Sequence, residues 1–301
     1  MQSSNICGRL ELFPNVLSIS DNLPVGSYAV RADDNGYFLV GQKSFVQTEK
    51  KVYGRRDDKV NKVLRGYEAM NRSVGVILSG DKGIGKSLFS RMLSMEVAER
   101  YNMPTIIVDT AYNGVGKFLA TIEQECLILF DEFEKVFDGQ RGARQEELLS
   151  FFDGISQQKH LFVVTSNSVS RLNDFLVNRP GRFHYHVRFE YPTAVEIKEY
   201  LEDHLAKDHH QEINKVIRLA SMMDLNYDCL RAISTEINFG LTLNEALQDL
   251  NILRIGSTAF NILIKLKDGT ELVRGYNADG NSRISSGWDS VSGGNDEYSI
   301  R

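Results

Sequence analysis

An eight-residue glycine-rich segment has the composition and spacing of a phosphate-binding loop. Its glycines allow backbone N–H groups to turn inward around phosphate oxygens, while the Lys86 ammonium can reach the β- and γ-phosphates and the Ser87 hydroxyl can ligate Mg²⁺. The segment therefore predicts a nucleotide site. We assign to nucleotide contact the loop and the residue after it, namely Gly80, Asp81, Lys82, Gly83, Ile84, Gly85, Lys86, Ser87 and Leu88.

Two carboxylates follow a second apolar segment, Cys126 to Phe130. We expect Asp131 to complete the Mg²⁺ shell with Ser87, and Glu132 to polarise the water that attacks the γ-phosphate. Asn167, after a third apolar segment, can orient the same water, although an asparagine after a strand is also an ordinary turn residue.

A rigid turn with two arginines, Arg179-Pro180-Gly181-Arg182, comes next in the chain. A guanidinium stays protonated and binds phosphoryl oxygens with two parallel hydrogen bonds, which suits the charge that develops during phosphoryl transfer. Arg179 and Arg182 are therefore candidate catalytic residues together with Glu132 and Asn167.

Alternating strands and helices must position these groups. The apolar segment Val74–Ser79 precedes the phosphate loop, and apolar residues at helical spacing follow it from Leu88 to Val97. Thr105–Val108, Cys126–Phe130 and Leu161–Val164 are typical of strands buried on both faces, with helices expected around 116–125 and 143–155. The pattern predicts an open, parallel α/β sheet of the P-loop NTPase type, whose ligands bind at the carboxyl ends of the strands.

The flanking segments have different patterns. Residues 9–50 look rich in β-structure, and we expect a small separate sheet there with a turn at Asp34-Asn35-Gly36. After Pro192 the pattern is helical, with capping boxes at Thr193 and Thr242 and further helices expected over 211–223 and 227–238. A hairpin is expected around 260–273, turning at residues 267–270, and a flexible tail over 277–301 that includes Trp288.

Composition narrows the class of protein. The 301 residues carry a formal net charge of −5, which does not indicate a nucleic-acid surface. Three scattered cysteines, without CxxC spacing, argue against a disulfide framework or structural zinc, and the histidines read as structural or solvated. Because no segment has the pattern of a membrane span or signal peptide, we expect an intracellular, cytoplasmic protein without membrane contact.

Taken in order, these motifs resemble those of AAA+ ATPases, and among them the AAA family proper, to which the protease motor FtsH belongs. The loop at Gly80 is similar to Walker A, Asp131-Glu132 to Walker B, Asn167 to sensor 1 and Asn178–Phe183 to the arginine-finger segment. The resemblance implies an α/β nucleotide-binding domain over 51–191 and a helical lid over 192–252, between a β-rich segment at 1–50 and a hairpin and tail at 253–301.

The resemblance also implies an assembly and further site residues. It implies a homo-oligomeric ring, usually a hexamer, in which Arg179 and Arg182 complete the neighbouring subunit's site, and ATP with Mg²⁺ as ligands. Tyr53 and Gly54 occupy the place of the backbone that holds adenine. Tyr112 resembles the pore-loop aromatic, although it follows its strand almost at once, and Arg231 is a weak candidate for sensor 2. No HExxH motif of a fused metalloprotease is present in the sequence.

Three functional hypotheses follow. The first is an ATP-hydrolysing ring that remodels or threads a protein partner. The second is a nucleic-acid motor or clamp-loader-like ATPase, which the acidic charge balance disfavours. The third is a nucleotide-gated scaffold, against which Glu132 and the paired arginines speak, because a pure switch has no need of them.

Overall fold

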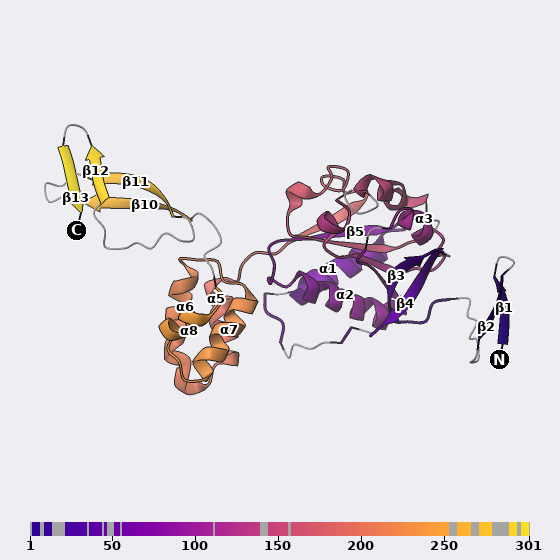
Figure 1. The fold of residues 1–301 in the computed structure, drawn as a ribbon, viewed down its shortest axis with the longest axis horizontal. Helices are drawn as coiled ribbons and strands as arrows, with labels where there is room; N and C mark the ends of the chain where they lie inside the picture. The colour runs from indigo at the N-terminus through magenta and orange to yellow at the C-terminus, as the bar shows by residue number, and fades with distance from the viewer. Residues whose placement is uncertain are drawn as a thin grey trace. The chain divides into compact units, whose positions relative to one another are not determined.

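The computed structural model divides the chain into two units, Met1–Glu190 and Tyr191–Arg301 (Figure 1). It describes residues 2–6, 9–13, 22–34, 36–43, 45–46, 51–54, 56–110, 112–138, 144–155, 158–252, 258–265, 271–278, 289–293 and 296–300. The predicted domain boundaries within these units stay predictions.

A seven-stranded sheet forms the centre of the first unit, with the strand order β4-β3-β6-β7-β8-β5-β9. Only β4 runs antiparallel to its neighbour. The sheet confirms the predicted α/β fold, and β5, which feeds the phosphate loop, lies between β8 and β9. The strands are β3 (Ser27–Asp33), β4 (Gly36–Gln42), β5 (Val74–Ser79), β6 (Thr105–Val108), β7 (Leu127–Phe130), β8 (Leu161–Ser166) and β9 (Phe183–Arg188).

The hairpin formed by β3 and β4, here called the N-terminal hairpin, differs from one expectation. β3 and β4 pair as predicted, but they extend the main sheet instead of forming a separate one. β3 pairs in parallel with β6, and the Thr105 N–H donates to the Gly26 carbonyl at 2.8 Å. β3 thus supplies backbone partners that β6 would otherwise lack as an edge strand. β1 (Gln2–Ile6) and β2 (Arg9–Phe13) pair with each other, while Asn35 of the predicted turn and Cys7 lie outside the described residues.

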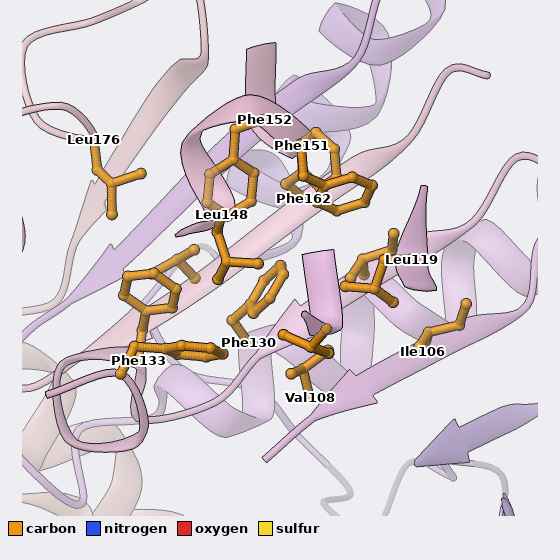
Figure 2. Close-up of a cluster of buried hydrophobic side chains, with 14 of the residues drawn as sticks. Ile106, Val108, Leu119, Phe130, Phe133, Leu148, Phe151, Phe152, Phe162 and Leu176 are labelled. Carbon is orange, nitrogen blue, oxygen red and sulfur yellow. The ribbon is translucent and has the colours of Figure 1, made fainter. Parts of the chain in front are cut away.

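Helices cover both faces of this sheet. β7 and β8 send alternate side chains into two apolar clusters, because successive residues of a strand point to opposite faces. One cluster contains Phe130 and Phe162 with further phenylalanines (Figure 2). The other contains Leu129 and Val163, and it packs against α1 and α2. The helices of the first unit are α1 (Arg56–Ala69), α2 (Lys86–Tyr101), α3 (Val115–Leu119) and α4 (Phe133–Val136).

The two helices expected around 116–125 and 143–155 are shorter than predicted. The first is the five-residue α3. The second includes a 3₁₀ turn, η1 (Gln145–Leu148), and a π-helical turn, η2 (Phe151–Ile155). Both Phe151 and Phe152 are buried in the cluster shown in Figure 2. The wider π turn accompanies burial of two consecutive aromatic side chains in one cluster, which the sequence pattern did not anticipate.

The second unit begins with helices. They are α5 (Ala194–His204), η4 (Lys207–Glu212), α6 (Ile213–Ala220), α7 (Tyr227–Asn238) and α8 (Leu243–Asp249). Both predicted capping boxes are confirmed: the Thr193 and Thr242 hydroxyls accept from the backbone N–H three residues later, and Glu196 and Glu245 reciprocate. Among the described residues, no helix has the length and apolar character needed to cross a membrane.

Two hairpins follow. β10 (Thr258–Lys265) pairs with β11 (Glu271–Ala278), which confirms the expected hairpin, while its turn at 267–270 lies outside the described residues. β12 (Asp289–Gly293) pairs with β13 (Asp296–Ile300), within the segment expected to be a flexible tail. The glycine-rich composition that suggested flexibility also favours tight turns, so it could not exclude this hairpin. Trp288 lies outside the described residues.

Gly75 in β5 offers a test of this packing. A Cβ atom there would lie 2.5 Å from the ring of Phe183, the first residue of β9. It would also lie 2.6 Å from the carbonyl oxygen of Arg182, which precedes β9. We expect Gly75→Ala to lower the free energy of unfolding by about 1–3 kcal/mol, because overpacking forces backbone shifts. Gly41→Ala in β4 is the control, since a Cβ there meets nothing within 4 Å. Urea denaturation followed by circular dichroism measures both; equal stability of the two variants would contradict the packing described.

Candidate functional site

The phosphate loop joins β5 to α2 with a backbone that only glycine adopts readily. Gly80, Gly83 and Gly85 have φ angles of 142°, 75° and 100°. These positive values are costly for other residues, so the glycine positions predicted from sequence coincide with the turns of the loop. Gly85 caps the start of α2, where the helix dipole is positive.

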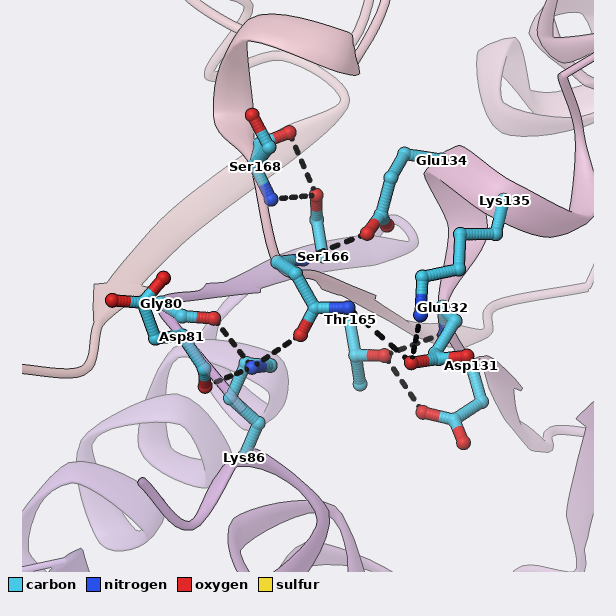
Figure 3. Close-up of polar contacts among 11 residues, drawn as sticks. Gly80, Asp81, Lys86, Asp131, Glu132, Glu134, Lys135, Thr165, Ser166 and Ser168 are labelled. Carbon is cyan, nitrogen blue, oxygen red and sulfur yellow. Dashed lines mark hydrogen bonds and ion pairs between the residues drawn. The ribbon is translucent and has the colours of Figure 1, made fainter. Parts of the chain in front are cut away.

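Lys86 turns back over this loop. Its ammonium donates to the carbonyl oxygens of Gly80 and Asp81, the latter at 2.6 Å, and to the Asn167 Oδ1 atom at 2.9 Å (Figure 3). Burial lowers the pKa of Lys86, and the nearby carboxylates, Glu134 foremost, oppose that shift. The ammonium therefore lies in the mouth of the loop, where phosphate oxygens can replace the carbonyl oxygens as acceptors.

Asn167 connects the loop to the acidic residues. Its Oδ1 atom accepts from Lys86, while its Nδ2 atom donates to Glu132 Oε1 at 3.3 Å. The carboxyl ends of β5, β7 and β8 thus meet through one side-chain amide. The structure brings together four residues that the sequence placed in the site from separate motifs: Lys86, Asp131, Glu132 and Asn167.

Thr165 orients both acidic residues, a role that the sequence analysis did not assign. Its hydroxyl donates to Asp131 Oδ1 at 2.7 Å and accepts from the Glu132 backbone N–H at 2.8 Å. Glu132 has a φ angle of 46°, an uncommon left-handed conformation, which the Thr165 hydrogen bond helps to hold. The polar run Thr165-Ser166-Asn167 at the end of a buried strand was the available signal.

Glu134 is a second residue that the sequence analysis left without a role. It is 6% exposed, and its Oε1 atom accepts the Asn167 backbone N–H at 2.9 Å. Its carboxylate therefore supports the segment that carries the bridging amide. The repetition of acidic residues in Asp131-Glu132-Phe133-Glu134 was the signal.

Glu132 has the ionisation state that a base needs. A hydrogen bond from the Lys135 ammonium lowers the pKa of Glu132, and the hydrogen bond from Asn167 acts in the same direction. The side chain is thus a carboxylate at neutral pH, able to accept a proton from water.

Comparison with known proteins agrees with this geometry. Residues 76–191 match the family model "ATPase family associated with various cellular activities (AAA)". Over these residues the chain is similar to AAA ATPase domains. This match includes the phosphate loop, the two acidic residues, Asn167 and the arginine turn, and it ends at the boundary between the two units.

Three relatives share this region. A 26S proteasome regulatory subunit 4 homolog of Dictyostelium discoideum is 27% identical over 182 residues, which cover 54% of this chain and 41% of that protein. The vesicular-fusion protein SEC18 of Saccharomyces cerevisiae is 28% identical over 145 residues, which cover 39% of this chain and 19% of that protein. The ATP-dependent zinc metalloprotease FtsH 1 of Phytoplasma mali is 26% identical over 163 residues, which cover 46% of this chain and 26% of that protein. The match thus spans less than half the length of each relative.

The two arginines of the turn at residues 179–182 differ in their surroundings. Arg182 forms a bidentate ion pair with Asp153 and donates to the Phe175 carbonyl at 3.1 Å. Arg179 is exposed, and its guanidinium lies 5.3 Å from the centre of the Phe175 ring. Arg72 donates to the carbonyls of Pro180 and Gly181 and so fixes the turn that joins the two arginines. The structure therefore places neither arginine among the contacts of Lys86, Glu132 and Asn167 described above.

The residue that follows the predicted adenine segment by two positions contacts the phosphate loop. Tyr53 is buried, Gly54 has a φ angle of 84°, and Arg56, which starts α1, donates to the Ile84 carbonyl at 2.8 Å. Asp81, Lys82 and Ser87 of the loop are exposed, and Leu88, which follows it, is half-buried. Their assigned contacts with nucleotide stay predictions.

The candidate pore-loop tyrosine packs against the N-terminal hairpin. Tyr112 makes an edge-on contact with Tyr37 of β4, whose ring also stacks on Phe118 at 5.0 Å between centres. The Tyr37 hydroxyl donates to the Asn113 carbonyl. In the second unit, burial raises the pKa of Tyr200, and the neighbouring Arg231 acts in the opposite direction. The pore role of Tyr112 and the sensor role of Arg231 stay predictions.

Replacing Thr165 tests the orientation of the acidic pair. Thr165→Val keeps the shape of the side chain but removes both hydrogen bonds, so we expect ATP hydrolysis to fall roughly 10- to 100-fold if Asp131 is a metal ligand as predicted. Thr165→Ser keeps the hydroxyl and is expected to retain most of the rate. Steady-state phosphate release measures both variants, with circular dichroism to confirm folding. Equal rates for the valine and serine variants would contradict this role.

Proposed function

We propose that this protein is an ATP-hydrolysing motor that works as a homo-oligomeric ring, a hexamer by family resemblance, and remodels or threads a protein partner. The observation that carries the proposal is the Asn167 amide, which contacts both the ammonium that would bind the γ-phosphate and the carboxylate that would activate water. A site that only bound nucleotide would need the first contact and not the second.

The lysine and the loop bind the triphosphate. Lys86 exchanges the Gly80 and Asp81 carbonyls for β- and γ-phosphate oxygens, which form stronger, charge-assisted hydrogen bonds with an ammonium. The backbone N–H groups of the glycine loop and the start of α2 supply the rest of the cradle.

The donor set at Ser87 and Asp131 fits Mg²⁺. A hydroxyl and a carboxylate are oxygen ligands of the kind that Mg²⁺ prefers, and Thr165 fixes the Asp131 carboxylate through Oδ1. When bound, the metal ion would neutralise charge on the β- and γ-phosphate oxygens. Asp131 and Ser87 would hold it at the carboxyl end of β7 and the start of α2.

Glu132 would then act as the base. Its carboxylate accepts a proton from the attacking water, and Asn167 holds that carboxylate, and with it the water, near the lysine-bound phosphate. The water oxygen attacks the γ-phosphorus as the bond to the β–γ bridging oxygen breaks, which leaves ADP and inorganic phosphate.

Arginines from a neighbouring subunit would complete the site. The exposed Arg179 is available for this role, whereas Arg182 must first leave Asp153 and Phe175. Such a finger contributes roughly 10³- to 10⁵-fold in related NTPases. The proposed ring is consistent with this shared site, since an isolated subunit has no neighbour to supply an arginine to its own nucleotide site.

The proposed protein substrate is supported by the relatives. Their names include a proteasome subunit, a vesicular-fusion protein and a metalloprotease, of which the first and third denote protein degradation. The FtsH-like character of the module and a cytoplasmic location are part of this proposal. The acidic net charge speaks against nucleic acid as the substrate.

Glu132→Gln separates binding from hydrolysis. We expect this variant to bind ATP as the wild type does, because the phosphate-binding groups are unchanged, and to hydrolyse it roughly 10²- to 10⁴-fold more slowly for lack of a base. Equilibrium binding of a fluorescent ATP analogue and single-turnover phosphate release measure the two properties. Unchanged turnover would exclude Glu132 as the base.

Mixing two inactive variants tests the shared site. Arg179→Ala has an intact base but no finger, and Glu132→Gln has an intact finger but no base. If sites are shared, mixed assemblies regain hydrolysis, because a glutamine subunit supplies Arg179 to an alanine neighbour. Phosphate release is measured over a range of mixing ratios and protein concentrations, with each variant alone as the control. Purely additive rates, with a mass that stays monomeric, would contradict the ring.

A further inference from the structure

Arg56 is buried beneath the phosphate loop. Arginine is seldom fully buried, yet this residue is 7% exposed at the start of α1. Its guanidinium donates to the Ile84 carbonyl at 2.8 Å. A Cβ atom on Gly85 would lie 2.1 Å from Arg56 Nη1, so the guanidinium occupies the space directly behind that glycine.

This contact fixes the orientation of a peptide group in the loop. The described residues contain no cis peptide bond, and in a trans peptide the carbonyl and the following N–H point in opposite directions. Because the Ile84 carbonyl points toward Arg56, the Gly85 N–H points to the other face of the loop. That N–H belongs to the group that the phosphate-loop motif directs at phosphate oxygens.

The Phe189 ring also contacts the guanidinium. The centre of the Phe189 ring lies 5.7 Å from Arg56 Cζ, within the range of a cation–π contact. Phe189 is itself fixed, since its backbone N–H donates to the Ser79 carbonyl at 2.8 Å and its ring packs edge-on against Phe89 of α2. The arginine is therefore held by the strand and the helix that flank the loop.

The charge of Arg56 also acts on the loop. A guanidinium stays protonated at every physiological pH, and a buried charge is screened less by salt than an exposed one. Lys86 places one positive charge in the mouth of the loop, and Arg56 places a second behind Gly85. Both favour an anionic ligand, although only Lys86 is positioned to touch it.

We propose that Arg56 is a positioning residue for the phosphates of the bound nucleotide: it locks the Ile84–Gly85 peptide with its N–H toward the ligand and adds a fixed positive charge behind the loop. This inference rests on the proposed nucleotide site. It assigns no contact with the adenine, so its effect belongs to the triphosphate part of the ligand.

Binding measurements on the full chain separate this role from general packing. A fluorescent ATP analogue is displaced by inorganic tripolyphosphate in one series and by adenosine in another. We expect Arg56→Gln to weaken the binding of the analogue and of tripolyphosphate roughly 10- to 100-fold, the range for loss of a charged hydrogen bond. Adenosine affinity stays unchanged. Arg56→Lys, which keeps the charge without the planar fork, is expected to fall between the glutamine variant and the wild type.

Two further variants complete the design. Arg65→Gln removes an exposed arginine from the same helix and is expected to bind all three ligands as the wild type does. Phe189→Leu removes the ring beneath the guanidinium, and a smaller loss confined to tripolyphosphate and the analogue is expected. If Arg56→Gln does not fold, as judged by circular dichroism, the lysine and leucine variants decide the question.

The outcomes distinguish the two proposals. Wild-type affinity of Arg56→Gln for tripolyphosphate, or an equal loss for tripolyphosphate and adenosine, would overturn the role of Arg56. Where the glutamine variant is unfolded, the same two results for both the lysine and leucine variants would overturn it. A wild-type chain that binds no ATP analogue would instead contradict the nucleotide site itself.

Discussion

The site depends on one side-chain amide at the edge of the sheet. Asn167 accepts from Lys86 with its oxygen and donates to Glu132 with its nitrogen, so its position sets the distance between the Lys86 ammonium and the Glu132 carboxylate. The backbone of Asn167 is itself held in place, because the buried Glu134 carboxylate accepts the Asn167 backbone N–H. Thr165, two residues earlier, fixes the acidic pair from the same strand end. A few hydrogen bonds at the end of β8 therefore control the whole constellation.

The two arginines of the turn have unequal surroundings. Arg182 binds Asp153 and the Phe175 carbonyl, and thereby ties the turn to the η2 segment of its own subunit. Arg179 is exposed beside the Phe175 ring. In a shared site, a guanidinium that must act on a neighbour needs a well-positioned backbone but few competing partners. In the proposed arrangement, Arg182 would supply that support and Arg179 the accessible charge.

The hairpin of β3 and β4 adds two strands to the five strands β5–β9 that carry the sequence motifs. β3 pairs with β6, and Arg31 of β3 forms a bidentate ion pair with Asp109 just after β6, with one N–O distance of 2.7 Å. β4 carries Tyr37, which contacts Tyr112, Asn113 and Phe118. The segment that follows β6 is thus held by the hairpin. In a ring that grips a protein chain, Tyr112 would work from a supported segment.

The sequence by itself determined most of the strands and helices of the sheet and pointed to the chemistry of the site. Apolar runs marked the strands, glycines marked the phosphate loop, and polar residues marked the strand ends, because these signals depend on local conformation and burial. Only the tertiary structure decided that β3 and β4 join the main sheet, that Thr165 and Glu134 orient the acidic residues and the amide, that Arg56 lies behind Gly85, and that Arg182 pairs with Asp153. Each of these joins residues that no local pattern connects, since strand order and side-chain partners arise from packing between distant segments.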